Sequence, residues 1–153
     1  MVGRRVMFWT GLFLLVGAVS CWAGGAIQTQ PAAQGPFEAD VIRASVRDNV
    51  LTVQVAFRCQ GTSSDPLSFR FGDVYITDLK NKKKYYPLKD SSGRYLAGPA
   101  ANWLEGGKFE SWMKPGDRSI FWVKFPAPPP DVQTIDIVVP GFLPFEDVPI
   151  TRK

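Results

Sequence analysis

The sequence contains no histidine and only two cysteines, Cys21 and Cys59. Without histidine, the chain lacks the commonest general base, the commonest metal ligand and the side chain that titrates near neutral pH. Serine–histidine and cysteine–histidine catalytic arrangements are therefore excluded, and zinc or blue-copper centres would lack their imidazole ligands. The two cysteines allow one disulfide, which we do not expect because it would join a flexible N-terminal segment to a strand.

Carboxylates are the remaining candidates for acid–base chemistry or metal binding. Glu105 and Glu110 are close in sequence, but nothing places them on opposite sides of a substrate groove. Asp73, Asp78 and Asp90 could supply oxygen ligands to calcium, although their sequence surroundings are more typical of turns and strand ends. We therefore expect a protein that is not an enzyme and that holds neither a cofactor nor a metal.

The first 23 residues have the three-part pattern of an export signal. Residues 1–5 include Arg4 and Arg5, residues 6–19 form an apolar run, and small residues follow up to Ala23. This pattern predicts a helical signal segment over residues 1–23. We expect an exported protein that is either periplasmic or lipid-anchored in the cell envelope.

The end of this segment allows three forms of processing. The tetrapeptide that ends at Cys21, Ala-Val-Ser-Cys, resembles a bacterial lipobox, in which the cysteine is lipidated and becomes the new N-terminus. Ser20 and Ala23 are small enough to precede an ordinary cleavage site. The apolar stretch is also close to the roughly 17–20 residues that span a bilayer, so an uncleaved anchor is a third alternative.

The rest of the chain divides into two regions. Residues 24–36 are rich in Gly, Ala, Gln and Pro, and predict a flexible linker. Residues 37–153 predict one β-sandwich domain. Taking Arg4 and Arg5 from the 18 basic residues leaves 16 against 14 acidic ones, a net charge of +2. This small excess gives no sign of nucleic-acid binding.

Apolar residues alternate with polar ones from Phe37 onward, which is typical of strands. The clearest strand is residues 50–59, where Cys59 shares the apolar face and is expected to be a small buried side chain. Asp48 and Asn49 tolerate the left-handed conformations of a two-residue hairpin turn. Further strands are expected at residues 42–46, 67–71, 73–79, 84–88, 109–112, 119–125 and 133–139.

About seven short strands, each with one apolar face, bury those faces most simply by pairing two sheets. We therefore predict an all-β fold, specifically an immunoglobulin-like two-sheet antiparallel sandwich. No amphipathic helix is predicted after Phe37.

Several strand and turn segments also resemble a known family. They read DVYITD at residues 73–78, KYYPLKD at 84–90, KPGD at 114–117 and FPAPP at 125–129. In this order the chain resembles the small immunoglobulin-like (telokin-like) domains of exported bacterial lipoproteins and envelope-associated proteins. The resemblance covers approximately residues 37–150 and implies an accessory, non-enzymatic module of the cell envelope.

Two segments are candidates for contact with a partner. Lysines gather around the expected turn at residues 80–83 and could contact an anionic surface, or could simply be solvated and protect a sheet edge; they are Lys80, Lys82, Lys83 and Lys84. Aromatic residues gather in the less regular stretch 95–112 and could anchor a partner or close one end of the sandwich; they are Tyr95, Trp103, Phe109 and Trp112.

The function that fits these features is a non-enzymatic, exported binding or scaffold module of the cell envelope. Its partner would be an envelope protein or surface component, with membrane attachment through a lipidated Cys21 as a further option. The alternative is a periplasmic protein that binds a small ligand or inhibits an envelope enzyme, which requires an apolar pocket of about 300 Å³ or more.

Overall fold

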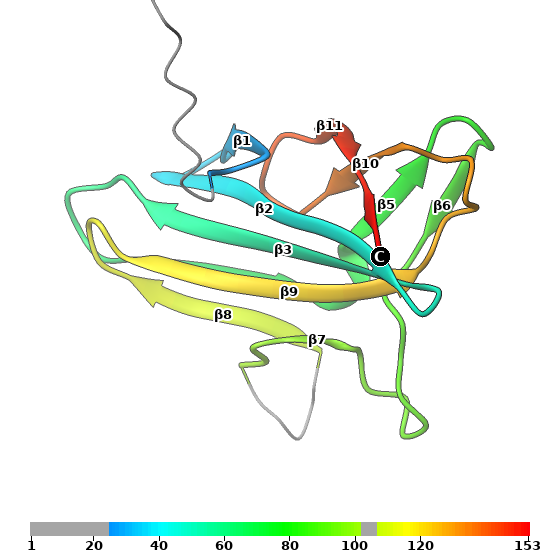
Figure 1. Cartoon of the computed structure of the whole chain (residues 1–153). Coiled ribbons are helices and arrows are strands. Elements are labelled where there is room, and N and C mark those ends of the chain that lie inside the picture. Colours follow the sequence, from blue (N-terminus) through cyan, green and yellow to red (C-terminus); the bar gives the residue numbers. More distant parts are fainter. Residues whose placement is uncertain (1–24, 102–106) are drawn as a thin grey trace, which may run out of the picture.

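The computed structural model describes residues 25–101 and 107–153. The expected signal segment and Cys21 lie outside the described residues. Twelve strands and one short 3₁₀ helix, η1 (Phe71–Asp73), make up the regular structure of the described part. The strands form three sheets around one hydrophobic core (Figure 1). The prediction of an all-β fold is confirmed.

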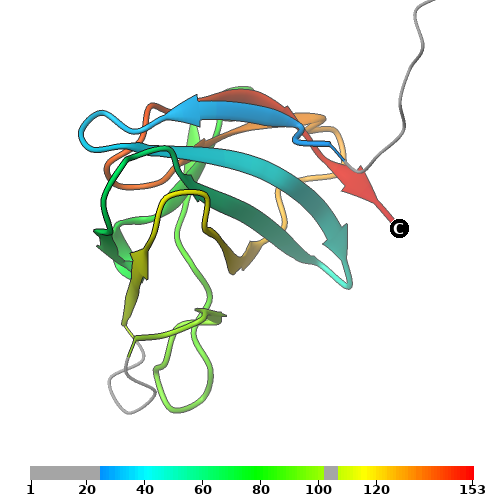
Figure 2. The same ribbon diagram turned by 90° about the vertical axis from the view of Figure 1, so that its left-hand side faces the viewer.

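The largest sheet has the order β1–β2–β3–β9–β7, with β12 also paired to β2. Its strands are antiparallel except for the short parallel pairing of β12 with β2. In Figure 2 its long strands β2 and β3 arch across the molecule. The members of this sheet are β1 (Gln28–Pro31), β2 (Phe37–Arg47), β3 (Val50–Cys59), β7 (Ala97–Gly98), β9 (Arg118–Pro126) and β12 (Thr151–Arg152).

Two smaller antiparallel sheets complete the fold. One has the order β11–β10–β5–β6, and the other pairs β4 with β8. Their strands are β4 (Asp65–Arg70), β5 (Tyr75–Asp78), β6 (Lys83–Tyr85), β8 (Lys108–Met113), β10 (Thr134–Val138) and β11 (Phe145–Pro149).

The alternation of side chains along β3, a central strand of the large sheet, gives the strand one buried face. Every second residue from Leu51 to Cys59 is buried, so one face of the strand lies entirely against the core. Cys59 is 2% exposed, which confirms the expectation of a small buried side chain. The turn before this strand has φ values of 51° at Asp48 and 60° at Asn49, as a two-residue hairpin requires.

The core is dominated by phenylalanine. The Phe57 ring lies 5.4 Å from that of Phe109 and 5.1 Å from that of Phe142, measured between centroids. Phe69 and Phe121 also pack around Phe57, at 5.7 and 6.4 Å. Because Phe69 and Phe109 belong to the β4–β8 sheet, Phe57 joins β3 to that sheet.

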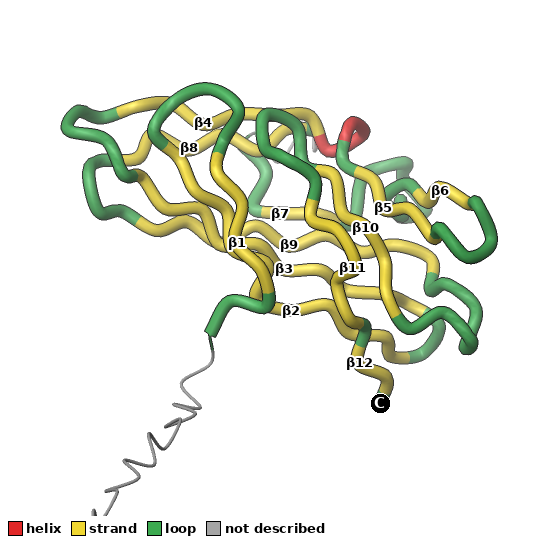
Figure 3. The backbone as a smooth tube through the Cα atoms, turned by 90° about the horizontal axis from the view of Figure 1, so that it is seen from above, coloured by secondary structure: helices red, strands yellow, loops and turns green. Residues whose placement is uncertain are grey.

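The structure differs from the sequence prediction in strand number and at the expected linker. About seven strands in two sheets were expected, whereas the described residues form twelve strands in three sheets. Part of segment 24–36 forms β1, which pairs with residues 38–41 of β2 and contacts β11 (Figure 3). This strand has no apolar face to bury. Its backbone hydrogen bonds to the edge of β2 hold it in the sheet instead.

Candidate functional site

The structure separates the aromatic residues predicted to bind a partner. Phe109 is completely buried, and Tyr95 packs edge-on against Phe71 at a centroid distance of 6.3 Å. Trp112 is 69% exposed, while Trp103 lies outside the described residues. Phe109 and Trp112 diverge because β8 is a regular strand, and residues three apart in a strand point to opposite faces.

Two exposed apolar residues on β9 were not among the predicted site residues. Ile120 is 43% exposed and Trp122 is 36% exposed, whereas Phe121 and Val123 beside them point into the core. The alternation of the expected strand 119–125 already implied this second, outward face. With Trp112, these residues make up what we call the β8–β9 apolar surface, carried by two strands that follow one another in the chain and belong to different sheets (Figure 1).

Trp122 is held in place by a glycine. Gly98 of β7 pairs with Trp122, and a Cβ placed on Gly98 would lie 3.0 Å from the indole atoms Cε2 and Cζ2. The ring therefore rests directly on the backbone of β7. Such close contact restricts the orientations that the indole ring can adopt.

The predicted lysines lie on what we call the lysine hairpin, which consists of β5, β6 and their connection at residues 79–82. Lys80 is paired with Asp131 at 2.6 Å, and this hydrogen bond lowers the pKa of Asp131. The Lys84 ammonium lies 3.8 Å from the ring centroid of Tyr75, and the Lys83 ammonium lies 5.0 Å from that of Tyr85. Lys82 closes the turn with a φ of 52°.

A buried aspartate holds the connection of this hairpin. Asp78 is 0% exposed, and its two carboxylate oxygens accept hydrogen bonds from the backbone N–H and the side-chain amide of Asn81, at 3.1 and 2.6 Å. Burial, followed by the nearby charge of Asp78, raises the pKa of Tyr85. Asp78 thus shapes the turn rather than facing solvent.

Asp90 and Asp73 are the other carboxylates considered as calcium ligands. Asp90 shapes its own turn, and Asp73 is an exposed residue of η1. Asp90 accepts hydrogen bonds from the backbone N–H groups of Ser92 and Arg94 within its own turn. Over residues 25–101 and 107–153 the structure contains no cluster of three or more acidic or cysteine side chains that could hold a metal ion.

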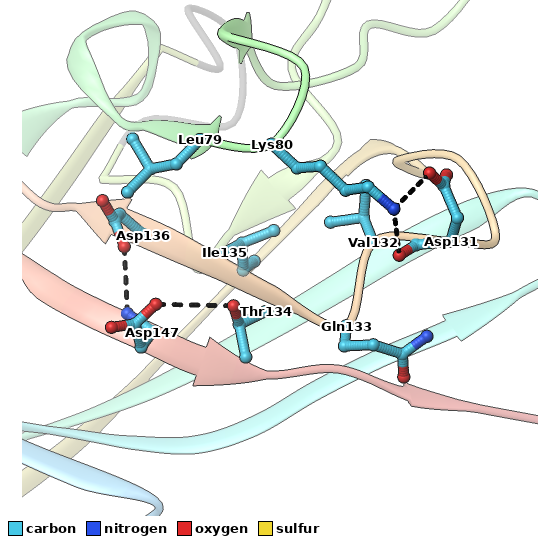
Figure 4. A pocket seen from close by; sticks show the side chains of 9 residues that line it. All are labelled: Leu79, Lys80, Asp131, Val132, Gln133, Thr134, Ile135, Asp136 and Asp147. Carbon is cyan, nitrogen blue, oxygen red and sulfur yellow. Dashed lines mark hydrogen bonds and ion pairs between the residues drawn. The ribbon is translucent and has the colours of Figure 1, made fainter.

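A shallow pocket of about 250 Å³ lies between the lysine hairpin and β10 (Figure 4). Its polar groups are largely engaged with one another. Lys80 pairs with Asp131, and the backbone N–H of Asp147 donates to the Asp136 carboxylate at 2.9 Å. The lining residues are Leu79, Lys80, Asp131, Val132, Gln133, Thr134, Ile135, Asp136 and Asp147. This volume is below the roughly 300 Å³ at which small-molecule pockets begin.

An ion-pair network occupies the outward face of the large sheet. The Arg58 guanidinium donates to both oxygens of Asp40, at 2.7 and 3.0 Å, and also pairs with Glu38 at 3.0 Å. Thr29 of β1 donates to Asp40 at 2.6 Å. Burial alone would raise the pKa of Asp40, but the hydrogen bonds from Arg58 and Thr29 outweigh it and hold the pKa below its ordinary value.

Comparison of the chain with protein-family models, with curated proteins and with solved structures finds no match. Among the described residues, no helix has the length and apolar character needed to cross a membrane.

Proposed function

We propose that the protein is an exported, non-enzymatic binding module of the cell envelope, with an immunoglobulin-like fold of the telokin-like type. In this proposal the β8–β9 apolar surface contacts a partner protein. The observation that carries it is Trp112, which is 69% exposed although it belongs to a regular strand. Tryptophan is among the residues that most often dominate the binding energy of protein interfaces.

The neighbouring side chains support the same surface. Ile120 and Trp122 add apolar area on the next strand, and Gly98 restricts the orientations of the Trp122 ring. Exposed aromatic anchors suit a protein partner better than a small ligand, which needs a concave site. The ligand-binding alternative has less support, because the pockets beside the lysine hairpin measure only about 250 and 290 Å³ and have charged linings.

The fold assignment is supported by the antiparallel sheets, their shared core and the short connecting turns. Export is supported by the charged, apolar and small-residue parts of segment 1–23. The intact mass of the protein isolated from its own host distinguishes the three forms. A lipidated Cys21, a plain new N-terminus and an uncleaved chain each have a different mass.

Photo-crosslinking tests the binding surface directly. We expect a photo-reactive residue at position 114, in the exposed turn between β8 and β9, to yield one defined adduct with an envelope protein. The double variant Trp112→Ser/Ile120→Ser should reduce that adduct about tenfold or more, because interface anchors each contribute about 2 kcal/mol or more.

Leu143 provides the matched control position, since it is also an exposed apolar residue at 48% exposure. The same photo-reactive residue at position 143 should not yield this adduct. An adduct that persists unchanged in the folded double variant would show that the β8–β9 apolar surface is not the binding site.

A further inference from the structure

The tip of the lysine hairpin combines an exposed leucine with unpaired positive charges. Leu79 is 64% exposed at the end of β5. Lys82, Lys83 and Lys84 follow within five residues, and none of them forms an ion pair with the described part of the chain. A single exposed leucine is ordinary by itself, but here it adjoins three lysines that form no ion pair within the described residues.

These side chains surround one shallow hollow. It has a volume of about 290 Å³ and is lined by Thr77, Asp78, Leu79, Lys82, Lys83 and Lys84. Its single carboxylate, Asp78, is fully buried and hydrogen-bonded to Asn81, so the lining carries three lysines against one engaged negative charge. The hollow therefore favours an anionic group.

The geometry also holds the tip in position. Lys80 donates to the carboxylate and the backbone carbonyl of Asp131, at 2.6 and 3.3 Å, and so ties the base of the connection to the chain before β10. Lys84 is placed against the Tyr75 ring, and the neighbouring Tyr86 is 56% exposed. Lys80 is thus a positioning residue. Lys82, Lys83 and Lys84 form no ion pair within the described residues, although the ammonium groups of Lys83 and Lys84 lie over tyrosine rings.

We propose that the tip of the lysine hairpin docks on the surface of a bilayer that contains anionic phospholipids. Leu79 enters the boundary between headgroups and acyl chains, and Lys82, Lys83 and Lys84 contact headgroup phosphates. Each basic side chain near such a surface contributes to the binding free energy. Exposed apolar residues contribute by burying apolar area in the bilayer, and tyrosine is favoured at the membrane–water interface. A free anion in the hollow would use the lysines but would leave Leu79 exposed.

The hairpin lies at the opposite end of the molecule from the turn that joins β8 to β9 (Figure 1). Membrane docking at one end therefore leaves the β8–β9 apolar surface accessible. The proposal depends on the hairpin residues alone and does not depend on the proposed function, so each can fail without the other.

Vesicle binding of the full chain as its host produces it tests the proposal. Vesicles of mixed phosphatidylcholine and phosphatidylglycerol are compared with vesicles of phosphatidylcholine alone. We expect the triple variant Lys82→Gln/Lys83→Gln/Lys84→Gln to bind the anionic vesicles about 100-fold more weakly. Leu79→Ser should weaken binding about tenfold. Added salt should weaken binding of the unmodified chain.

Matched controls use residues elsewhere on the surface. The triple variant Lys108→Gln/Lys114→Gln/Lys124→Gln removes the same charge, and Leu143→Ser removes a comparably exposed leucine. Both should bind as the unmodified chain does, and unfolding midpoints identify any variant that has lost its fold. Equal weakening by the two triple variants would overturn the proposal in favour of non-specific charge attraction.

A fluorophore gives a second readout. The Cys21→Ala substitution removes any lipid anchor at that residue, so the dye reports only on the hairpin. In a Cys21→Ala background, an environment-sensitive dye attached at Leu79→Cys should shift to the blue on anionic vesicles, while the same dye at Leu143→Cys should not. No shift at position 79 would overturn the proposal. Loss of the shift with inorganic phosphate, at unchanged ionic strength, would instead assign the hollow to a free anion.

Discussion

At the scale of single residues, Asp40 is the charged group whose environment has the clearest thermodynamic consequence. Its side chain is only 10% exposed, although it lies on the outward face of the large sheet. Arg58 of β3 and Thr29 of β1 both donate to it, so one carboxylate connects three neighbouring strands. Removing it would leave a partly buried guanidinium without its main partner.

Because the pKa of Asp40 is lowered, the contribution of this carboxylate to the stability of the fold depends on pH. A carboxyl group whose pKa is lower in the folded state stabilises the fold above its unfolded-state pKa of about 3.9, and this stability is lost as the pH falls through the folded-state pKa. We expect Asp40→Asn to lower the free energy of unfolding by about 1–3 kcal/mol at pH 7. The difference from the unmodified chain should shrink below about pH 4.

Urea unfolding between pH 7 and pH 3 measures this effect. Glu110→Gln is the control, because Glu110 forms an exposed pair with Lys108 and its loss should change stability by less than about 0.5 kcal/mol. An Asp40→Asn deficit that stays constant down to pH 3 would contradict the assignment.

At the scale of secondary-structure elements, the β2–β3 turn is the feature that sequence predicts best. Asp48 and Asn49 both have positive φ, and they set a register in which Arg47 pairs with Val50. A one-residue shift would move every apolar residue of β2 to the outward face. The turn and the alternation of the two strands therefore specify the same pairing.

Substitution of Asn49 tests this turn. Alanine in the left-handed conformation costs about 1–2 kcal/mol, so Asn49→Ala should lower the free energy of unfolding by about 1 kcal/mol. Asn49→Gly should preserve it, because glycine adopts this conformation freely and the backbone carbonyl of residue 49 can still accept its bond from Ala127. Thermal unfolding of both variants provides the comparison, and equal stabilities would be inconsistent with a strained turn position.

The same scale shows where sequence patterns fail. β1, β7 and β12 have between two and four residues, which is too short for a recognisable alternation. They form because a neighbouring strand offers free N–H and C=O groups, a condition created by the fold and not by their own residues. Within the irregular stretch 95–112 the sequence predicts a strand at residues 109–112, yet it groups Phe109 and Trp112 as one candidate surface; β8 places them on opposite faces.

At the scale of the whole molecule, Phe57 joins the large sheet to the β4–β8 sheet. Its ring is fully buried and packs against aromatic rings from β4, β8 and β9. We expect Phe57→Ala to lower the free energy of unfolding by about 3–5 kcal/mol, because it leaves a cavity at the point where the sheets meet.

The unfolding transition should remain single when circular dichroism and tryptophan fluorescence are compared. Trp112→Ala is the control, since this exposed side chain should contribute less than about 0.5 kcal/mol. Two separate transitions in the unmodified chain would show that the sheets unfold independently.

The sequence alone determined the strand-forming character of the chain, the inward faces of β3 and β9, and the turn at Asp48 and Asn49. These features depend on alternation and on local conformational preference, which act between residues that are close in sequence. It also identified the lysine-rich turn as a surface feature.

Only the tertiary structure decided how these parts meet. It divided the strands into three sheets, placed Phe109 in the core and Trp112 outside it, and showed that Lys80 pairs with Asp131 from a segment 51 residues away. Pairings over such distances depend on how all strands share one core, which no local pattern encodes. The β8–β9 apolar surface and the position of the lysine hairpin are consequences of that arrangement.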